Sequence, residues 1–318
     1  MPFKHNASRC RPIPRVRHRV ANWPCCEAGL RRRGDLTVWV DEAALAGWQA
    51  PRRSAPGGQP RCSGLAIELV PTPRVVFRLA LRQAGGFARS VLQLLGVALP
   101  VPGHGTLNRR GRAFAGRQAR VPPGGGPVHL VLDSTGLGVL GQGGGRAAKH
   151  GRLKLRLGVD ANTGEIAAPV LTDGDANDAA QAPALLRRCG GALASVTADG
   201  ACERDPVYRA AAARQPGPPP GVVIPPRSDA VPSTADPDQH TQRDRHVRLV
   251  ADGGRIGWQR AAGCGKRNHV ETTRGRYKHL IGPKLRARSR SAQLGEIALA
   301  VQVLNRMIRE AKPVSVRR

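Results

Sequence analysis

Apolar positions divide the chain into a first part with helical periodicity and a second part in which strands and helices alternate. Between residues 62 and 114, apolar side chains recur at helical spacing, which predicts short helices over 75–81, 86–95 and 106–114. Pro71 and Pro73 interrupt what would otherwise be one longer helix. Before this region, a short strand is expected at residues 36–40.

From residue 128 onwards the pattern predicts a sheet. The continuous apolar run 128–133 is typical of a central strand covered on both faces. Residues 153–159 and 166–171 flank an Asn-Thr-Gly turn, which predicts a hairpin. Further strands are expected at 192–198 and 222–224, and helices at 176–189, 206–213, 243–253, 269–281 and 291–311. This order predicts an α/β fold with a mixed sheet flanked by helices.

A segment rich in Pro and Gly, residues 121–126, reads as a linker between the two parts. We therefore expect an N-terminal helical region over residues 1–120, with a basic and poorly ordered start, and a second domain over residues 127–318. Short helices that end in a basic helix, the one with Arg109 and Arg110, resemble a helix-turn-helix module that reads a major groove. A basic bundle that merely packs on the next domain is the alternative.

The charge of the chain indicates its class of partner. A net charge of +29 and a pI near 11.6 suit a polyanion, and nucleic acid leads the candidates. No apolar run approaches the length of a membrane span and the start lacks a signal-peptide pattern, so a cytoplasmic, nucleoid-associated protein is expected. The seven cysteines contain no Cys-x-x-Cys pair, which favours reduced thiols over a disulfide framework or a zinc site.

Three acids stand where a metal site could form. Asp133 closes the first predicted strand of the second part, Asp199 follows the strand at 192–198, and Glu271 lies on the helix at 269–281. Carboxylate oxygens are the ligands that Mg²⁺ prefers, and two such ions can promote displacement at a phosphodiester. Each acid taken alone is also ordinary turn or cap chemistry. Basic residues lie near the glutamate, namely Arg267, Arg274 and Lys278.

Two further patterns have simpler readings. Asp173, Asp175 and Asp178 form a second acidic cluster, but they lack the spacing of a calcium loop, so capping of the helix at 176–189 is favoured. The glycine-rich residues 141–145 lack the Lys-Ser/Thr of a phosphate-binding loop and read as a flexible connection.

Short motifs are spread over the chain from residue 34 to its end. They include Gly-Asp-Leu-Thr-Val-Trp-Val-Asp-Glu (34–42), Leu-Asp-Ser-Thr-Gly-Leu (132–137), Thr-Ala-Asp-Gly-Ala (197–201) and Ile-Gly-Pro-Lys-Leu-Arg-Ala-Arg (281–288). With these motifs the chain resembles bacterial insertion-sequence transposases of the DDE type, in the IS-five group. Their glutamate signature reads Tyr, two residues, Arg, three residues, Glu, six residues, Lys. This chain has Arg267, Glu271 and Lys278 at those intervals.

The resemblance implies a ribonuclease-H-like catalytic core in which Asp133, Asp199 and Glu271 bind two Mg²⁺ or Mn²⁺ ions. In such enzymes water attacks the phosphodiester at the element end, and the freed 3′-hydroxyl then attacks target DNA. Arg267 and Lys278 would hold the terminal DNA, and the N-terminal helices would recognise the inverted repeats. Because two ends must be joined, a dimer is expected in the DNA complex.

Departures from the family pattern raise a second reading. Cys264 stands where the signature has Tyr, and Cys202 and Cys62 also stand where relatives commonly carry Tyr. The connection at residues 141–150 looks shortened. The alternative to an active transposase is therefore a decayed, catalytically impaired copy that only binds the DNA of the element ends.

Overall fold

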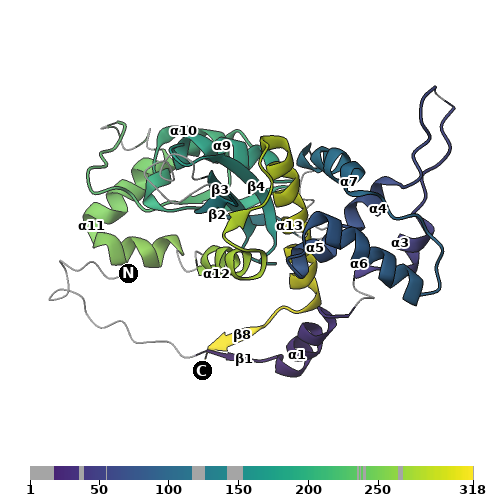
Figure 1. Ribbon diagram of the computed structural model, residues 1–318. Coiled ribbons are helices and arrows are strands. Elements are labelled where there is room, and N and C mark those ends of the chain that lie inside the picture. The colour runs from purple at the N-terminus through teal and green to yellow at the C-terminus, as the bar shows by residue number, and fades with distance from the viewer. Residues whose placement is uncertain are drawn as a thin grey trace.

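The computed structural model describes most of the chain (Figure 1). The residues that it describes are 18–35, 39–54, 56–116, 126–141, 153–234, 236, 238, 241–263 and 268–317. The basic start, most of the predicted linker and most of the glycine-rich connection lie outside these residues, as do Cys264 and Arg267.

Short helices form the N-terminal region, at the right of Figure 1. They are α1 (Trp23–Arg32), α3 (Glu42–Ala46), α4 (Gly64–Leu69), α5 (Thr72–Val76), α6 (Leu81–Leu94) and α7 (His104–Gly111), which is followed by the 3-10 turn η2 (Arg112–Gly116). The predicted interruption at the two prolines is confirmed: Pro71 precedes α5 and Pro73 lies in its first turn, so α4 and α5 are separate helices.

Two local predictions in this region are wrong. The helix expected at residues 75–81 ends at Val76, and a new helix begins at Leu81, where the side chain of Gln83 accepts a hydrogen bond from Ala80 N at 2.8 Å. A side-chain cap of this kind stabilises a separate helix start. Trp39 and Val40 are not in a strand, and residues 36–38 of the strand expected there lie outside the described residues.

A mixed sheet forms the second region. Its strands are β2 (Val128–Val139), β3 (Leu153–Asp160), β4 (Ile166–Asp173), β5 (Leu193–Thr197) and β6 (Gly221–Val223), in the order β4-β3-β2-β5-β6, with β7 (Lys284–Leu285) beside the end of β2. The β2, β3 and β4 pairs are antiparallel, whereas β5 runs parallel to β2 and to β6. The predicted β3–β4 hairpin is confirmed, and its turn contains Gly164 with φ +76°.

Helices cover both faces of this sheet. The helices α9 (Asp178–Arg188) and α10 (Asp205–Ala212) lie on one face, and α12 (Asn268–Arg276), the π-helical turn η6 (Tyr277–Ile281) and α13 (Arg290–Glu310) lie on the other. Side chains alternate along β2: Leu130 and Leu132 pack towards α9, and Val131 packs towards α12. The predicted α/β class with a mixed, doubly covered sheet is confirmed.

The helix α13 joins the two regions, as Figure 1 shows. Its Ile297 packs in the core beneath the sheet, while Ala298 packs against the N-terminal helices. The approach is close at Gly295, where an added Cβ would lie 2.5 Å from Gly111 O. The sequence did not predict that β1 (His18–Val20) and β8 (Ser315–Arg317) pair.

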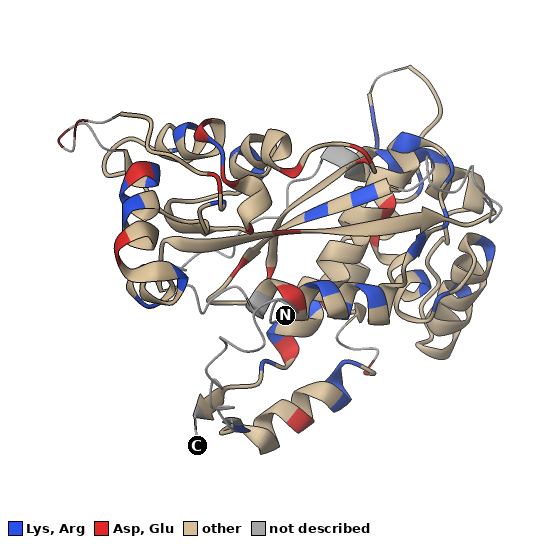
Figure 2. Ribbon diagram, turned by 90° about the vertical axis from the view of Figure 1, so that its left-hand side faces the viewer, with Lys and Arg blue, Asp and Glu red and all other residues tan. Residues whose placement is uncertain are grey.

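Two further elements complete the description. The helix α11 (Gln242–Ala262), which is kinked at Gly254 (φ +66°), contacts α10, and the 3-10 turn η3 (Gly200–Cys202) follows β5. Within the described residues, no helix is both long and apolar enough to cross a membrane. Figure 2 shows that Lys and Arg are distributed over helices of both regions.

Candidate active site

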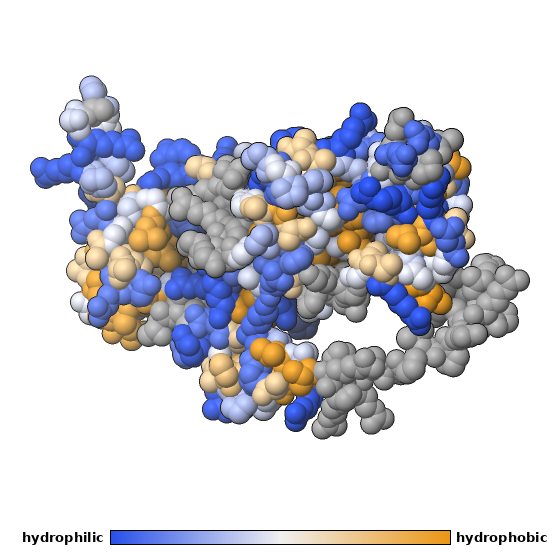
Figure 3. Space-filling model, turned by 180° about the vertical axis from the view of Figure 1, so that it is seen from behind, coloured by the Kyte–Doolittle hydropathy of each residue, from blue (hydrophilic) through white to orange (hydrophobic). Residues whose placement is uncertain are grey.

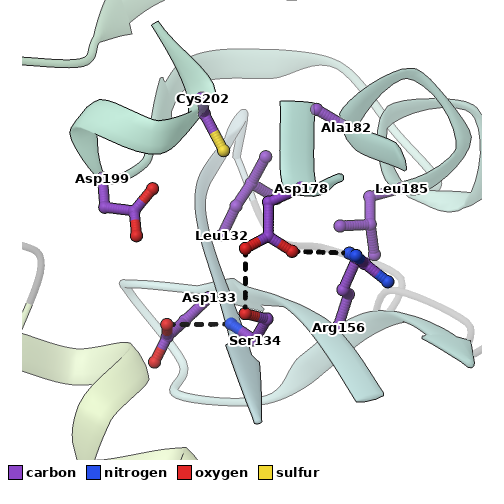
Figure 4. Close-up of a pocket in the computed structure, with 9 residues that line it drawn as sticks. All are labelled: Leu132, Asp133, Ser134, Arg156, Asp178, Ala182, Leu185, Asp199 and Cys202. Carbon is purple, nitrogen blue, oxygen red and sulfur yellow. Dashed lines mark hydrogen bonds and ion pairs between the residues drawn. The ribbon is translucent and has the colours of Figure 1, made fainter. Parts of the chain in front are cut away.

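Asp133 on β2 and Asp199, just after the end of the neighbouring parallel strand β5, lie at equivalent positions along the chain direction. Val131 on β2 is paired with Thr197 on β5, and each aspartate follows its paired residue by two positions. Both carboxylates therefore line one cleft (Figure 4). The prediction that Asp133 closes its strand is wrong, because Ser134 to Leu137 continue the antiparallel pairing with β3.

The alternation of β2 directs two adjacent side chains to opposite sides. The carboxylate of Asp133 lies towards α12, where its Oδ2 forms an ion pair with Arg274 Nη1 at 3.1 Å. Its Oδ1 accepts a hydrogen bond from Ser134 N at 2.8 Å. Ser134 itself points towards α9, where its hydroxyl donates to Asp178 Oδ2 at 3.3 Å. Two consecutive residues of β2 therefore contact helices on opposite faces of the sheet, Asp133 contacting α12 and Ser134 contacting α9.

A third acid of the cleft, Asp178, is neutralised by two cations from β3. Its Oδ1 lies 2.8 Å from Arg156 Nε, and its Oδ2 lies 2.8 Å from Lys154 Nζ. Arg156 is 1% exposed and also donates to Thr172 Oγ1 and to a backbone carbonyl. Figure 4 shows Asp178 between Ser134 and Arg156. With both oxygens engaged, Asp178 holds β2, β3 and α9 in position.

This network was not predicted, although the sequence carries two signals for it. Lys154 and Arg156 occupy alternate positions of a strand whose other residues up to Val159 are apolar or glycine, so they share one face and need a buried partner. The acidic cluster was interpreted as helix capping, but Asn177 is the cap residue of α9, with its side chain accepting from Ala179 N at 2.9 Å. Asp178 lies one position later and reaches across to β3.

The third predicted ligand, Glu271, is carried on an exposed stripe of α12. Val270 and Thr273 face the sheet and are nearly inaccessible, and Tyr277 of η6 is completely buried beside them. Glu271 and Lys278 are exposed, and with Arg274 they follow i, i+3 and i+7 spacing along one stripe. Because Arg274 reaches Asp133, this stripe lies next to the cleft.

The three acids are nevertheless only partly brought together. Asp133 and Asp199 share the cleft, whereas Glu271 does not line it. Among the described residues, no three side chains of His, Cys, Asp or Glu are close enough to hold a metal ion. The two aspartates fit a hard divalent cation in their chemistry and placement.

The loop that follows Asp199 is fixed by its own contacts. Asp199 accepts a hydrogen bond from Ala201 N at 3.1 Å and so caps η3. Glu203 is buried and pairs with Arg243 of α11. Burial, and then the charge of Asp199, raise the pKa of the Cys202 thiol to about 12. At neutral pH this thiol is protonated and adds no charge to the cleft.

The start of α11 is held by a buried carboxylate. Asp244 is inaccessible to solvent and accepts hydrogen bonds from the hydroxyls of Ser233 and Thr241 at 2.6 and 2.8 Å. Burial acts to raise its pKa, but these hydrogen bonds outweigh burial and hold the pKa well below its usual range. The helix that anchors Glu203 is therefore itself firmly capped.

The predicted DNA-binding arginines of the first region differ in their surroundings. Arg109 is exposed on α7. Arg110 is partly buried and donates to Cys62 O at 2.7 Å, so it has a structural contact within the N-terminal region. Arg267 lies outside the described residues.

The sequence matches two models of known protein families. Residues 124–306, more than half of the chain, match a family model described as "Transposase DDE domain", and residues 31–142 match a second model with the same description. The chain belongs to the transposase DDE domain family. This transposase carries its mixed sheet and flanking helices in an arrangement consistent with a ribonuclease-H-like core. Its DDE domain implies DNA binding and nuclease or transesterification activity in transposition.

Proposed function

We propose that this transposase cleaves DNA strands at the ends of an insertion sequence of the IS-five group and transfers the freed 3′ ends to target DNA. The observation that supports this most is the cleft shared by Asp133 and Asp199, which follow paired positions of two parallel strands. The stripe of α12 that carries Glu271 lies next to the same cleft through Arg274.

In this proposal Asp133, Asp199 and Glu271 would hold Mg²⁺ or Mn²⁺, with two ions expected. The bound metal would polarise the phosphodiester and activate the attacking oxygen. The chain contributes the orientation of its ligands: Ser134 N holds one oxygen of Asp133, and the η3 turn holds one oxygen of Asp199. The cation pair around Asp178 keeps β2 and β3 in register at the cleft.

We further propose that basic residues beside the cleft hold the terminal DNA. Lys278 and Arg274 lie on the Glu271 stripe, and Arg267 precedes it in sequence. Each can neutralise a phosphate, and arginine can do so with two hydrogen bonds. Residues 1–120, with Arg109 and Arg110, would recognise the repeats, and residues 127–318 would form the catalytic domain. Joining two ends would require a dimer in the DNA complex.

A protein that binds the ends without cutting is the second candidate. The cysteines at positions of family tyrosines favour it, because a thiol can neither stack on a base nor replace the phenol. At Cys202 the substitution is tolerated within the fold, since the thiol is buried and neutral. The intact set of three acids favours the active enzyme.

Strand cleavage tests the proposal directly. DNA carrying the chain's own flanking repeats is incubated with the protein and Mg²⁺ or Mn²⁺, and nicked products are resolved on a denaturing gel. We expect Asp133→Asn, Asp199→Asn and Glu271→Gln each to reduce cleavage by more than about a hundredfold. Asp252→Asn, which changes an exposed acid of α11, is the control and should cleave normally. Undiminished cleavage by Asp133→Asn would refute the site, and binding without cleavage by the unmodified protein would favour the second candidate.

A further inference from the structure

A loop of the N-terminal region projects from the body of the molecule. It comprises residues 50–54 and 56–61, between α3 and α4, and rises at the upper right of Figure 1. Gln49 and Cys62 pair as an antiparallel bridge at its base, and Ala50 N donates to Arg61 O at 3.2 Å. The loop is therefore a short hairpin that stands away from the helices.

The base of this hairpin is anchored in the core of the region. Trp48 and Cys62 are 2% and 6% exposed, and both donate to Pro100 O, at 2.8 and 3.4 Å. On the outer side, Ser63 N donates to Trp48 O at 2.9 Å. Arg110 of α7 donates to Cys62 O. The direction in which the hairpin projects is therefore set by several independent contacts.

Its distal part is held by a side chain. Gln59 Oε1 accepts from Arg53 N at 2.9 Å, and Gln59 Nε2 donates to Arg53 O at 2.7 Å. The amide of Gln59 thus replaces a pair of strand hydrogen bonds across the hairpin. A loop with this closure loses less conformational freedom on binding a partner than an unconstrained one does.

The hairpin carries positive charge alone. Arg52, Arg53 and Arg61 are exposed, and no Asp or Glu occurs between residues 43 and 67. Figure 2 shows a basic segment on the projecting loop, and Figure 3 shows it as a hydrophilic projection on the upper left. None of these guanidinium groups has an ion-pair partner among the residues that the structure describes. Exposed arginines without nearby acids favour a polyanionic partner.

We propose that this arginine hairpin docks on the phosphate backbone of duplex DNA, outside the cleft and independently of cleavage. The identity of the partner rests on the proposed function, whereas the surface itself rests on the contacts above. Arginine binds phosphate through paired hydrogen bonds, and such contacts position a protein on DNA without reading its sequence. The hairpin would add affinity and orientation for DNA that reaches the active-site cleft.

Salt-dependent binding tests the hairpin without any cleavage. The protein and its variants bind a short labelled duplex of arbitrary sequence in EDTA, and anisotropy is followed over a range of salt. Arg52→Ala/Arg53→Ala should lower the slope of log affinity against log salt by about 2, which weakens binding on the order of 50-fold at about 0.1 M salt. The matched control, Arg187→Ala/Arg209→Ala, removes the same charge from exposed positions of α9 and α10 and should leave the slope nearly unchanged.

Two outcomes would overturn the hairpin proposal, and neither would bear on the proposed strand cleavage. One is equal loss of slope in the two double variants, which would show a general effect of charge. The other is that Arg52→Ala/Arg53→Ala weakens binding to anionic lipid vesicles but leaves the affinity for duplex DNA unchanged. A third variant, Gln59→Ala, keeps all charges and removes the closure. It should bind several-fold more weakly with an unchanged slope, and unaltered affinity would contradict docking of a preformed loop.

Discussion

The two aspartates and the glutamate of the candidate site are held in opposite ways. Asp133 lies inside the central strand and Asp199 caps a short turn directly after the neighbouring strand, so backbone hydrogen bonds fix both. Glu271 lies on the exposed stripe of α12, which packs on the sheet through Val270 and Thr273 and is followed by the buried Tyr277 of η6. Two of the three predicted ligands therefore lie in or directly after a strand of the sheet, and the third lies on a helix packed on the sheet.

Because of this difference, the cleft with Asp133 and Asp199 can exist before Glu271 is added to it. The sheet forms the cleft without DNA, but Arg274 of α12 holds Asp133 on the side where a third ligand would enter. Under the proposed function, DNA that attracts Arg274 and Lys278 would also move Glu271, because the three residues share one stripe. Changes on the sheet side should then affect stability and metal binding together. Changes on the helix side should affect metal binding with little loss of stability.

The largest effect is expected from Asp178→Ala, which removes the α9 carboxylate that contacts β2 and β3 of the sheet. The substitution leaves Arg156 buried without its carboxylate, which should lower the free energy of unfolding by about 3–5 kcal/mol. It also leaves two uncompensated cations beside a cleft that must accept a divalent metal. Denaturant titration should show the lost stability, and the rise in melting temperature on addition of Mn²⁺ should disappear.

Glu165→Ala is the matched control for this prediction. Glu165 is also buried and also pairs with an arginine, but the Arg309 side chain is 53% exposed and can be hydrated when its partner is removed. The expected loss is about 1 kcal/mol, with the Mn²⁺ effect retained. If Asp178→Ala kept the full Mn²⁺ effect, the network would be structural only and would have no role at the cleft.

The sequence predicted those parts of the fold whose signals are local. The β3–β4 hairpin follows from alternation on both sides of a short turn, and the first strand follows from a continuous apolar run. The end of β2 was misplaced because Ser-Thr-Gly after Asp133 reads as a turn, whereas pairing with Lys154 and Arg156 keeps it extended. That pairing depends on residues about twenty positions away, which local pattern does not show.

The candidate site shows the same limit. Asp133 and Asp199 were predicted as neighbours because both follow strand patterns, and the structure places them in one cleft. The role of Glu271 stays a prediction, since its helix is exposed on that stripe. Asp178 was missed because its three partners lie on two other strands. The pairing of β1 with β8 joins the two ends of the chain and has no local signal.

Arg274→Ala should sharpen the comparison on the helix side. Its ion pair with Asp133 is partly exposed, at 40% and 15% of the two side chains, so the free energy of unfolding should change by less than about 1 kcal/mol. Without the competing guanidinium, Mn²⁺ should bind roughly fivefold more tightly in the absence of DNA. Mn²⁺ titration by electron paramagnetic resonance measures this. Arg89→Ala, an exposed arginine of α6, is the charge-matched control, and identical Mn²⁺ affinity in both variants would show that Arg274 does not compete.

The smallest effect is expected from Tyr277→Phe, beneath the helix stripe. Tyr277 is completely buried, burial raises the pKa of its hydroxyl well above the usual range, and this hydroxyl has no hydrogen-bond partner among the described residues. Removing an unsatisfied buried hydroxyl while keeping the ring should raise the free energy of unfolding by up to about 1 kcal/mol. Amide exchange in α12 should slow by a similar factor, while exchange in β2 stays the same. A loss of more than about 1 kcal/mol would mean that the hydroxyl does find a partner, and that α12 is tied to the sheet as firmly as the two aspartates are.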